Sequence, residues 1–146
     1  MQMLPSVRTN PPVVNEFVAA RLSQPEAHLL REACYDCHSH ETRWRWYSRV
    51  APASWWIASH VKKGRERLDF SDWPQTRPWE AKAKLESIAA ALRDDSMPPS
   101  SYRLMHSQAR LSLEQRVRLA AEMKAEAETL TPPVSADRTR FTSAHR

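Results

Sequence analysis

The sequence predicts an all-helical fold in which proline-containing loops join the helices. Glycine is almost absent, with one residue in 146, and the tight turns of β-hairpins depend on glycine. Alanine, leucine, glutamate and arginine are abundant, and apolar residues recur three and four positions apart in several segments, which is the spacing of one helix face. At this length the chain forms one domain with one core.

The helices are expected in a fixed order along the chain. Residues 1–22 are rich in proline and predict an extended lead-in. Ser23 followed by Pro25 is a helix-start signal, and Ser112 with Gln115 forms a capping box. Helices are expected from 23 into 34 and over 52–68, 79–92 and 113–130, with a short helical turn within 100–110. The folded domain thus covers 23–131, and the polar tail 132–146 is typical of a mobile segment.

Residues 34–38 read Cys-Tyr-Asp-Cys-His, the pattern C-x-x-C-H, and contain both cysteines of the chain. Two thiols at this spacing can each add across a vinyl group of haem, and the adjoining histidine then meets the iron from one face. Cys34 and Cys37 are therefore predicted to carry one covalently bound haem c, with His38 as the proximal iron ligand. No separate disulfide within the chain is available.

Two other uses of the cysteine pair compete with haem attachment. A dithiol redox pair is usually found in a strand-helix-strand context, which the flanking residues do not provide. A structural zinc site would need a second ligand pair in a short motif of its own, which the sequence lacks. The histidines available for such a site are His38, His40, His60 and His106.

Met97 is the predicted sixth, distal ligand of the iron. It stands before two prolines, and rigid backbone presents a thioether in a fixed position, whereas a core methionine is usually chosen for its flexibility. His60 lies on the apolar stripe of its predicted helix and is the alternative ligand. Met105 and His106 are further candidates, and an open sixth position is the remaining option.

The chain has a formal net charge of +5, and basic residues concentrate in its middle. Such a surplus can steer a redox partner with an acidic docking surface or meet anionic lipid headgroups. Nucleic-acid binding is not predicted, because no recognised binding motif accompanies the charge. No segment is long and apolar enough to span a bilayer, and the first residues do not form a signal peptide.

Several segments carry a resemblance to a known family. They are Cys34-Tyr35-Asp36-Cys37-His38-Ser39, Trp46-Tyr47-Ser48, Ala51-Pro52-Ala53-Ser54-Trp55, Phe70-Ser71-Asp72-Trp73, Met97-Pro98-Pro99, Tyr102 and His106. Between about residues 30 and 125 the chain resembles the bacterial haem-binding domain family with a single C-x-x-C-H motif. The resemblance implies a cytochrome c-like bundle of about four to five helices packed around one covalently bound haem, with long proline-containing loops.

The resemblance also implies export. Haem is ordinarily attached to this motif outside the cytoplasm, and Arg8-Thr9-Asn10-Pro11-Pro12 is similar to the segment that follows an N-terminal membrane anchor in the family. We therefore expect a periplasmic or otherwise extracytoplasmic protein, anchored in its full-length form by a segment that this chain lacks.

The sequence departs from the family pattern at two places. His40 stands where Asn is common and adds a candidate ligand near the haem. Asp95-Ser96 stands where a glycine and an acidic residue are common, which predicts a different loop shape before Met97.

The leading functional hypothesis is one-electron transfer by a mono-haem c-type cytochrome domain with His/Met ligation. The alternative is a haem-based sensor or small-ligand-binding module with an open or displaceable sixth position. No Ser/His/Asp or paired-carboxylate constellation stands out, so a non-catalytic electron carrier is favoured over an enzyme.

Overall fold

The computed structural model describes residues 8–16, 18–74 and 77–130, and the regular structure in this part of the chain is helical. Among these residues the sole extended pairing is an isolated bridge between Asn15 and Asp72. The elements are α1 (Val18–Arg21), α2 (Gln24–His38), η1 (Trp46–Arg49), α3 (Ala53–Arg67), α4 (Pro78–Arg93), α5 (Ser100–Met105), η2 (Ser107–Ala109) and α6 (Leu113–Thr129). The predicted all-helical class is confirmed, and the arrangement is compatible with a cytochrome c-like bundle.

The helix ends follow the sequence signals closely. α2 begins directly after Ser23, and α4 begins at a proline. The capping box of α6 is formed, because the Gln115 backbone N–H donates to Ser112 Oγ at 3.1 Å and the Ser112 N–H donates to Gln115 Oε1 at 2.8 Å. The single turns α1 and η1 were not predicted, because segments of four residues are too short to show an apolar period.

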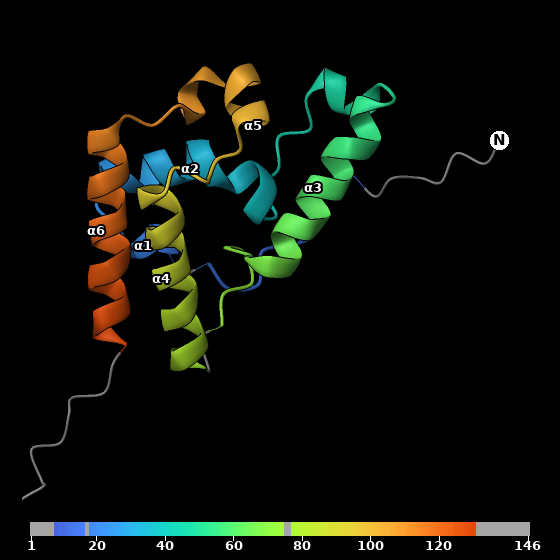
Figure 1. Ribbon diagram of the computed structural model, residues 1–146. Coiled ribbons are helices and arrows are strands. Elements are labelled where there is room, and N and C mark those ends of the chain that lie inside the picture. Colours follow the sequence, from blue (N-terminus) through green and yellow to red (C-terminus); the bar gives the residue numbers. More distant parts are fainter. Residues whose placement is uncertain (1–7, 17, 75–76, 131–146) are drawn as a thin grey trace, which may run out of the picture.

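The hydrophobic core lies where α2 crosses the pair α4 and α6. Figure 1 shows α4 and α6 side by side and antiparallel, with α2 across them and α3 beyond the C-terminal end of α2. Leu30 from α2, Leu85 from α4 and Leu119 from α6 are fully buried there. Phe70 and Trp73 extend this core toward α3, with their rings stacked at 6.2 Å.

The described part of the lead-in lies along the surface and is hydrogen-bonded to it. The backbone N–H groups of Val14 and Asn15 donate to Ser71 O at 2.9 and 3.0 Å, and Asn15 O accepts from the Trp73 N–H at 3.0 Å. Arg8 Nη1 donates to Ser48 O at 2.9 Å. These bonds place residues 14 and 15 beside the segment that follows α3, and Arg8 beside η1.

Two further sequence predictions concern the C-terminal tail and membrane-spanning segments. The polar tail predicted to be mobile, 132–146, lies outside the described residues. Among the helices that the structure describes, none combines the length and the apolar character needed to cross a bilayer.

Candidate functional site

The cysteine motif forms the last turns of α2 and borders two adjoining cavities. Cys34, Cys37 and His38 line one cavity of about 880 Å³, called here the motif cavity. Cys37 also lines the second, of about 970 Å³, called the aromatic cavity because Trp44, Tyr47, Trp56 and Tyr102 line it. Both volumes include space open to solvent.

The chain's single glycine is the point at which α3 touches the motif. A Cβ atom at Gly64 would lie 2.5 Å from the backbone oxygen of Cys37 and 3.2 Å from its carbonyl carbon. Backbone atoms cannot move aside as the end of a flexible side chain can. Only glycine therefore allows α3 to approach the end of α2 this closely.

His38 is held in a defined orientation by the same close approach. Its Nδ1 lies 3.0 Å from Gly64 O and 3.1 Å from Leu68 O. Since both partners are carbonyl oxygens, Nδ1 carries the proton and donates, which leaves the lone pair of Nε2 available. Burial lowers the pKa of His38, and this favours the neutral ring that a metal ligand requires.

The thiols of Cys34 and Cys37 are free, and their surroundings do not activate them. Burial, with a smaller contribution from Cys37, raises the pKa of Cys34 to about 12. Burial and the neighbouring Asp36 carboxylate raise the pKa of Cys37 to about 11. A dithiol redox pair works through a thiolate with a lowered pKa, so these surroundings argue against that alternative.

The zinc alternative has no support among the residues that the structure describes. In this part of the chain, no group of three or more Cys, His, Asp or Glu side chains could hold a metal ion. His40 lines neither cavity, because its Nδ1 lies 2.8 Å from Pro12 O and its Nε2 lies 2.8 Å from Asp69 Oδ2. The extra candidate ligand that the sequence offered at position 40 is therefore not brought to the site.

The structure brings both leading candidates for the sixth ligand to the motif cavity. Met97, with 38% of its surface exposed, and His60 line this cavity with Cys34 and His38. His60 Nδ1 lies 2.9 Å from Trp56 O in its own helix, so Nδ1 donates and Nε2 is left as an acceptor. The geometry does not choose between the two residues.

The apolar stripe expected along α3 is only partly buried. Val61 is buried, but Trp56 is 50% exposed and His60 is exposed. The physical reason is that this part of α3 faces the two cavities instead of another helix. Met105, one of the further ligand candidates, lines the aromatic cavity and not the motif cavity.

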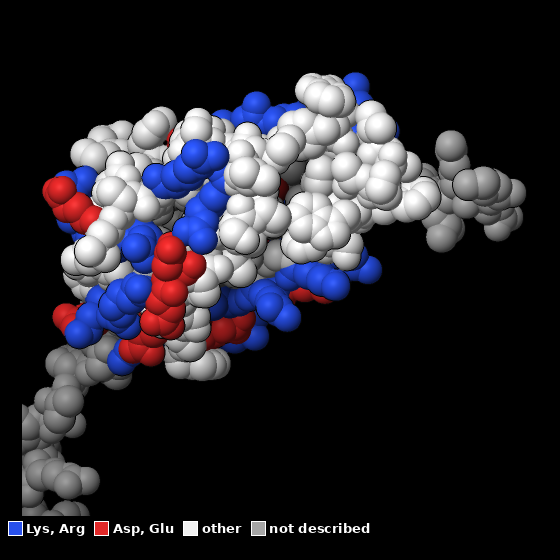
Figure 2. Space-filling model, turned by 45° about the horizontal axis from the view of Figure 1, so that its top comes forward, with Lys and Arg blue, Asp and Glu red and all other residues white. Residues whose placement is uncertain are grey.

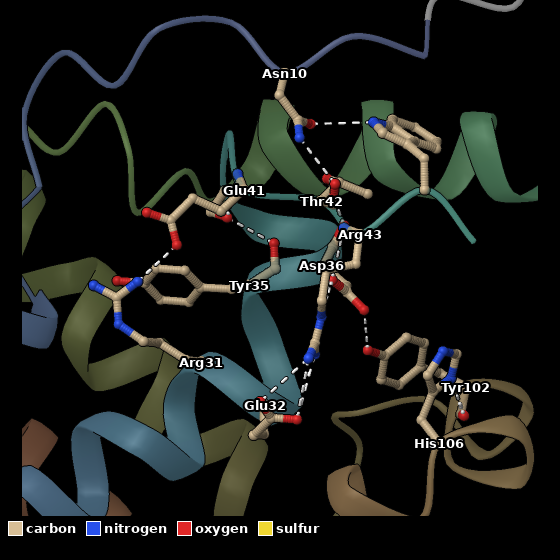
Figure 3. Close-up of polar contacts among 12 residues, drawn as sticks. Asn10, Arg31, Glu32, Tyr35, Asp36, Glu41, Thr42, Arg43, Tyr102 and His106 are labelled. Carbon is tan, nitrogen blue, oxygen red and sulfur yellow. Dashed lines mark hydrogen bonds and ion pairs between the residues drawn. The ribbon is translucent and has the colours of Figure 1, made fainter.

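A polar cluster built on Asp36 joins the cysteine motif to α5, as Figure 3 shows. Asp36 is 6% exposed. Its Oδ1 accepts from the Arg43 backbone N–H at 3.0 Å and from Arg43 Nε at 3.2 Å, while its Oδ2 accepts from Tyr102 Oη at 2.6 Å. Burial and then the Asp36 hydrogen bond raise the pKa of Tyr102, so the phenol stays protonated as a donor.

His106 belongs to the same cluster and is buried against Tyr102. The two rings stack at 3.9 Å, and His106 Nδ1 lies 2.9 Å from Tyr102 O. Nδ1 therefore donates to this carbonyl, and Nε2 accepts from Tyr47 Oη at 2.7 Å. Because both nitrogens are used, His106 is not available as an iron ligand in this arrangement.

Asp36 was not singled out from the sequence, although it stands between the two cysteines. Its partner Tyr102 is 66 positions away, and no local pattern reports such a contact. The one signal in the sequence is a carboxylate between two cysteines expected to border a haem, since a charged group that becomes buried there needs a partner.

Uncharged side chains dominate the surface around the cavities. In Figure 2 they cover most of the right-hand part of the molecule, where α3 lies, with lysine and arginine side chains above and below. Trp46 of η1, Val50 directly after η1 and Trp55 in the first turn of α3 are exposed and line neither cavity. We call these three residues the tryptophan tip.

The residues present fit a haem attached at the motif. Two free thiols, a histidine with Nε2 available and a further methionine border one cavity, which is the set of donors that a c-type haem uses. The lining of both cavities is largely apolar, as a porphyrin requires.

Comparison with known proteins gave one match. A family model described as a haem-binding domain matches residues 1–125 of the chain. No curated protein and no solved structure gave a match.

Proposed function

Because the chain belongs to the haem-binding domain family, we propose that it is a mono-haem c-type cytochrome domain that carries single electrons. The observation that carries this proposal is the meeting of Cys34, Cys37, His38 and Met97 on one cavity. When bound, haem supplies an iron that alternates between the ferrous and ferric states. One haem c per chain would use both cysteines.

The cysteines would hold the haem and His38 would bind its iron. Each thiol would supply the sulfur of one thioether link to a vinyl group of the haem, and the thiol hydrogen would go to the other vinyl carbon. The carbonyls of Gly64 and Leu68 hold His38 Nδ1–H, which fixes the ring and strengthens Nε2 as a ligand.

Met97 is the proposed sixth ligand, and His60 is the alternative. The two prolines after Met97 and the position of its side chain on the motif cavity support the methionine. His/Met ligation gives a higher reduction potential than His/His ligation. With His38 and Met97 both holding the iron, the bound haem would carry electrons and would leave no position on the iron for a small molecule.

The proposed partner is a redox protein with an acidic docking surface. Arg45 and Arg49 flank Trp46 at the tryptophan tip, and among the described residues neither has an acidic side chain paired with it. The Trp46 ring meets the Tyr47 ring edge-on at 5.7 Å, and Tyr47 lines the aromatic cavity. Tryptophan and arginine are favoured at protein interfaces, so this tip is where the partner would approach the haem.

The proposed location is outside the cytoplasm, with a membrane anchor in the full-length protein. Covalent attachment of haem to the motif and the resemblance of residues 8–12 to the segment after such an anchor support this location.

A ligand-sensing module is the second candidate function. The 38% exposure of Met97 favours it, because a half-exposed ligand is more easily displaced by a small molecule. Binding of carbon monoxide by the ferrous protein at the rate of a five-coordinate haem would support sensing over electron transfer.

Two measurements test the proposal. The chain is produced with a haem-maturation system and run on a denaturing gel, and haem should stay with the wild type and be lost in a Cys34→Ala/Cys37→Ala variant. The ferric wild type should show a sulfur-to-iron charge-transfer band that Met97→Ala lacks. Persistence of the band in Met97→Ala would exclude this residue as the ligand.

A further inference from the structure

α5 is held to the rest of the molecule by polar contacts instead of by a buried face. None of its residues, Ser100 to Met105, is buried, and it packs mainly on the short turn η2 that follows it. α5 begins at Ser100, three residues after Met97. Whatever fixes α5 therefore also fixes the backbone that carries Met97.

The strongest of these polar contacts reaches the cysteine motif itself. Tyr102, in the middle of α5, donates to Asp36 Oδ2 at 2.6 Å, and Asp36 stands between Cys34 and Cys37 (Figure 3). The other Asp36 oxygen is held by Arg43. The carboxylate is thus a fixed acceptor, and a hydrogen bond to a buried carboxylate is stronger than one between neutral groups.

The other ties of this segment run to elements outside the motif. His106 accepts from Tyr47 of η1. Arg103 pairs with Asp95 at 2.7 Å, and Asp95 adopts the left-handed region with φ of 55° in the loop before Met97. The Tyr102 bond is therefore the direct polar link between α5 and the helix end that holds both cysteines.

We propose that the Tyr102–Asp36 hydrogen bond clamps residues 97–105 to the cysteine motif, which makes Tyr102 a positioning residue for the sixth ligand of the iron. The inference rests on the proposed function, because it takes Met97 as that ligand. Asp36, which lies inside the cysteine motif, would then also fix the position of Met97 relative to His38.

The test compares two phenylalanine variants of the full, haem-loaded chain. Tyr102→Phe keeps the ring that stacks on His106 and removes only the hydroxyl donor. Tyr35→Phe is the matched control, because Tyr35 Oη also donates to a carboxylate, Glu16 Oε1 at 2.9 Å, but makes no link to α5. Imidazole is the probe, since it binds ferric iron only when the sixth ligand leaves.

Loss of the clamp should make imidazole bind about tenfold more tightly in Tyr102→Phe, the effect expected for removing one hydrogen bond to a charged group. Amide hydrogen exchange over residues 97–105 should also become faster in this variant. Tyr35→Phe should match the wild type in both measurements.

Three outcomes separate this inference from the proposed function. Unchanged imidazole affinity and unchanged exchange in Tyr102→Phe would overturn the clamp even if Met97→Ala loses the charge-transfer band. An equal effect in Tyr35→Phe would overturn it as well, since general loosening would then be the cause. If Met97→Ala keeps the charge-transfer band, Met97 is not the sixth ligand. Amide hydrogen exchange over residues 97–105 in Tyr102→Phe then tests by itself whether the hydrogen bond holds this segment, and unchanged exchange would overturn the clamp.

Discussion

Replacement of Gly64 by alanine tests whether the contact between α2 and α3 is as close as the structure has it. In an ordinary helix interior this change stabilises a protein by about 1 kcal/mol, because alanine is the better helix former. Here the new methyl carbon would lie 2.5 Å from Cys37 O. Relief of that overlap requires the two helices to separate, and overpacking of this kind costs about 1 to 3 kcal/mol.

The assay is urea unfolding of the full, haem-loaded chain. Gly64→Ala should lower the midpoint with the slope unchanged, and it should also alter the iron spectrum, because the carbonyl of residue 64 accepts from His38 Nδ1. Ser59→Ala on the same helix is the control and should shift stability by less than about 0.5 kcal/mol. A Gly64→Ala protein as stable as the wild type, or more stable, would refute the reasoning.

Three further predictions follow from other parts of the site. His60→Ala should leave the spectrum of the ferric protein unchanged, and a wild type that lacks the sulfur-to-iron band and changes its spectrum in His60→Ala would make His60 the sixth ligand. Arg49→Gln should slow reduction of anionic hexacyanoferrate roughly twofold at low ionic strength and not at high salt, so equal slowing at both would contradict an electrostatic role. The hydrogen bond from Ser23 and, to a smaller extent, that from Arg118 hold the pKa of Glu26 below its usual 4.5. A carboxyl group with a depressed pKa stabilises the folded protein at higher pH, and this stabilisation is lost as the pH falls. The unfolding free energy of the wild type should therefore drop more steeply below pH 4.5 than that of Glu26→Gln, and parallel curves would contradict this assignment.

The helices were predictable from the sequence because their signals are local. The capping box at Ser112 and the apolar period of residues 79–92 each lie within a few turns, and the structure places α6 and α4 there. The motif is also local, since C-x-x-C-H is five consecutive residues. The residues proposed to attach haem, Cys34, Cys37 and His38, could therefore be predicted from the sequence directly.

The long-range contacts of the site were not predictable in the same way. The sequence shows that Gly64 is the only glycine, but its role depends on Cys37 of another helix. The bond between Asp36 and Tyr102 likewise depends on how α5 returns to α2. His106 was a candidate ligand by residue type alone, and only its neighbours Tyr47 and Tyr102 show that both of its nitrogens are used.

Covalent attachment of haem at Cys34 and Cys37 is the feature on which the proposed function depends most directly. Intact mass measurement of the matured and then denatured chain tests this attachment. We expect a mass increase of one haem, with no thiol left to react with an alkylating reagent. A chain with the unmodified mass, or one lighter by the two hydrogens lost to a Cys34–Cys37 disulfide, would contradict it.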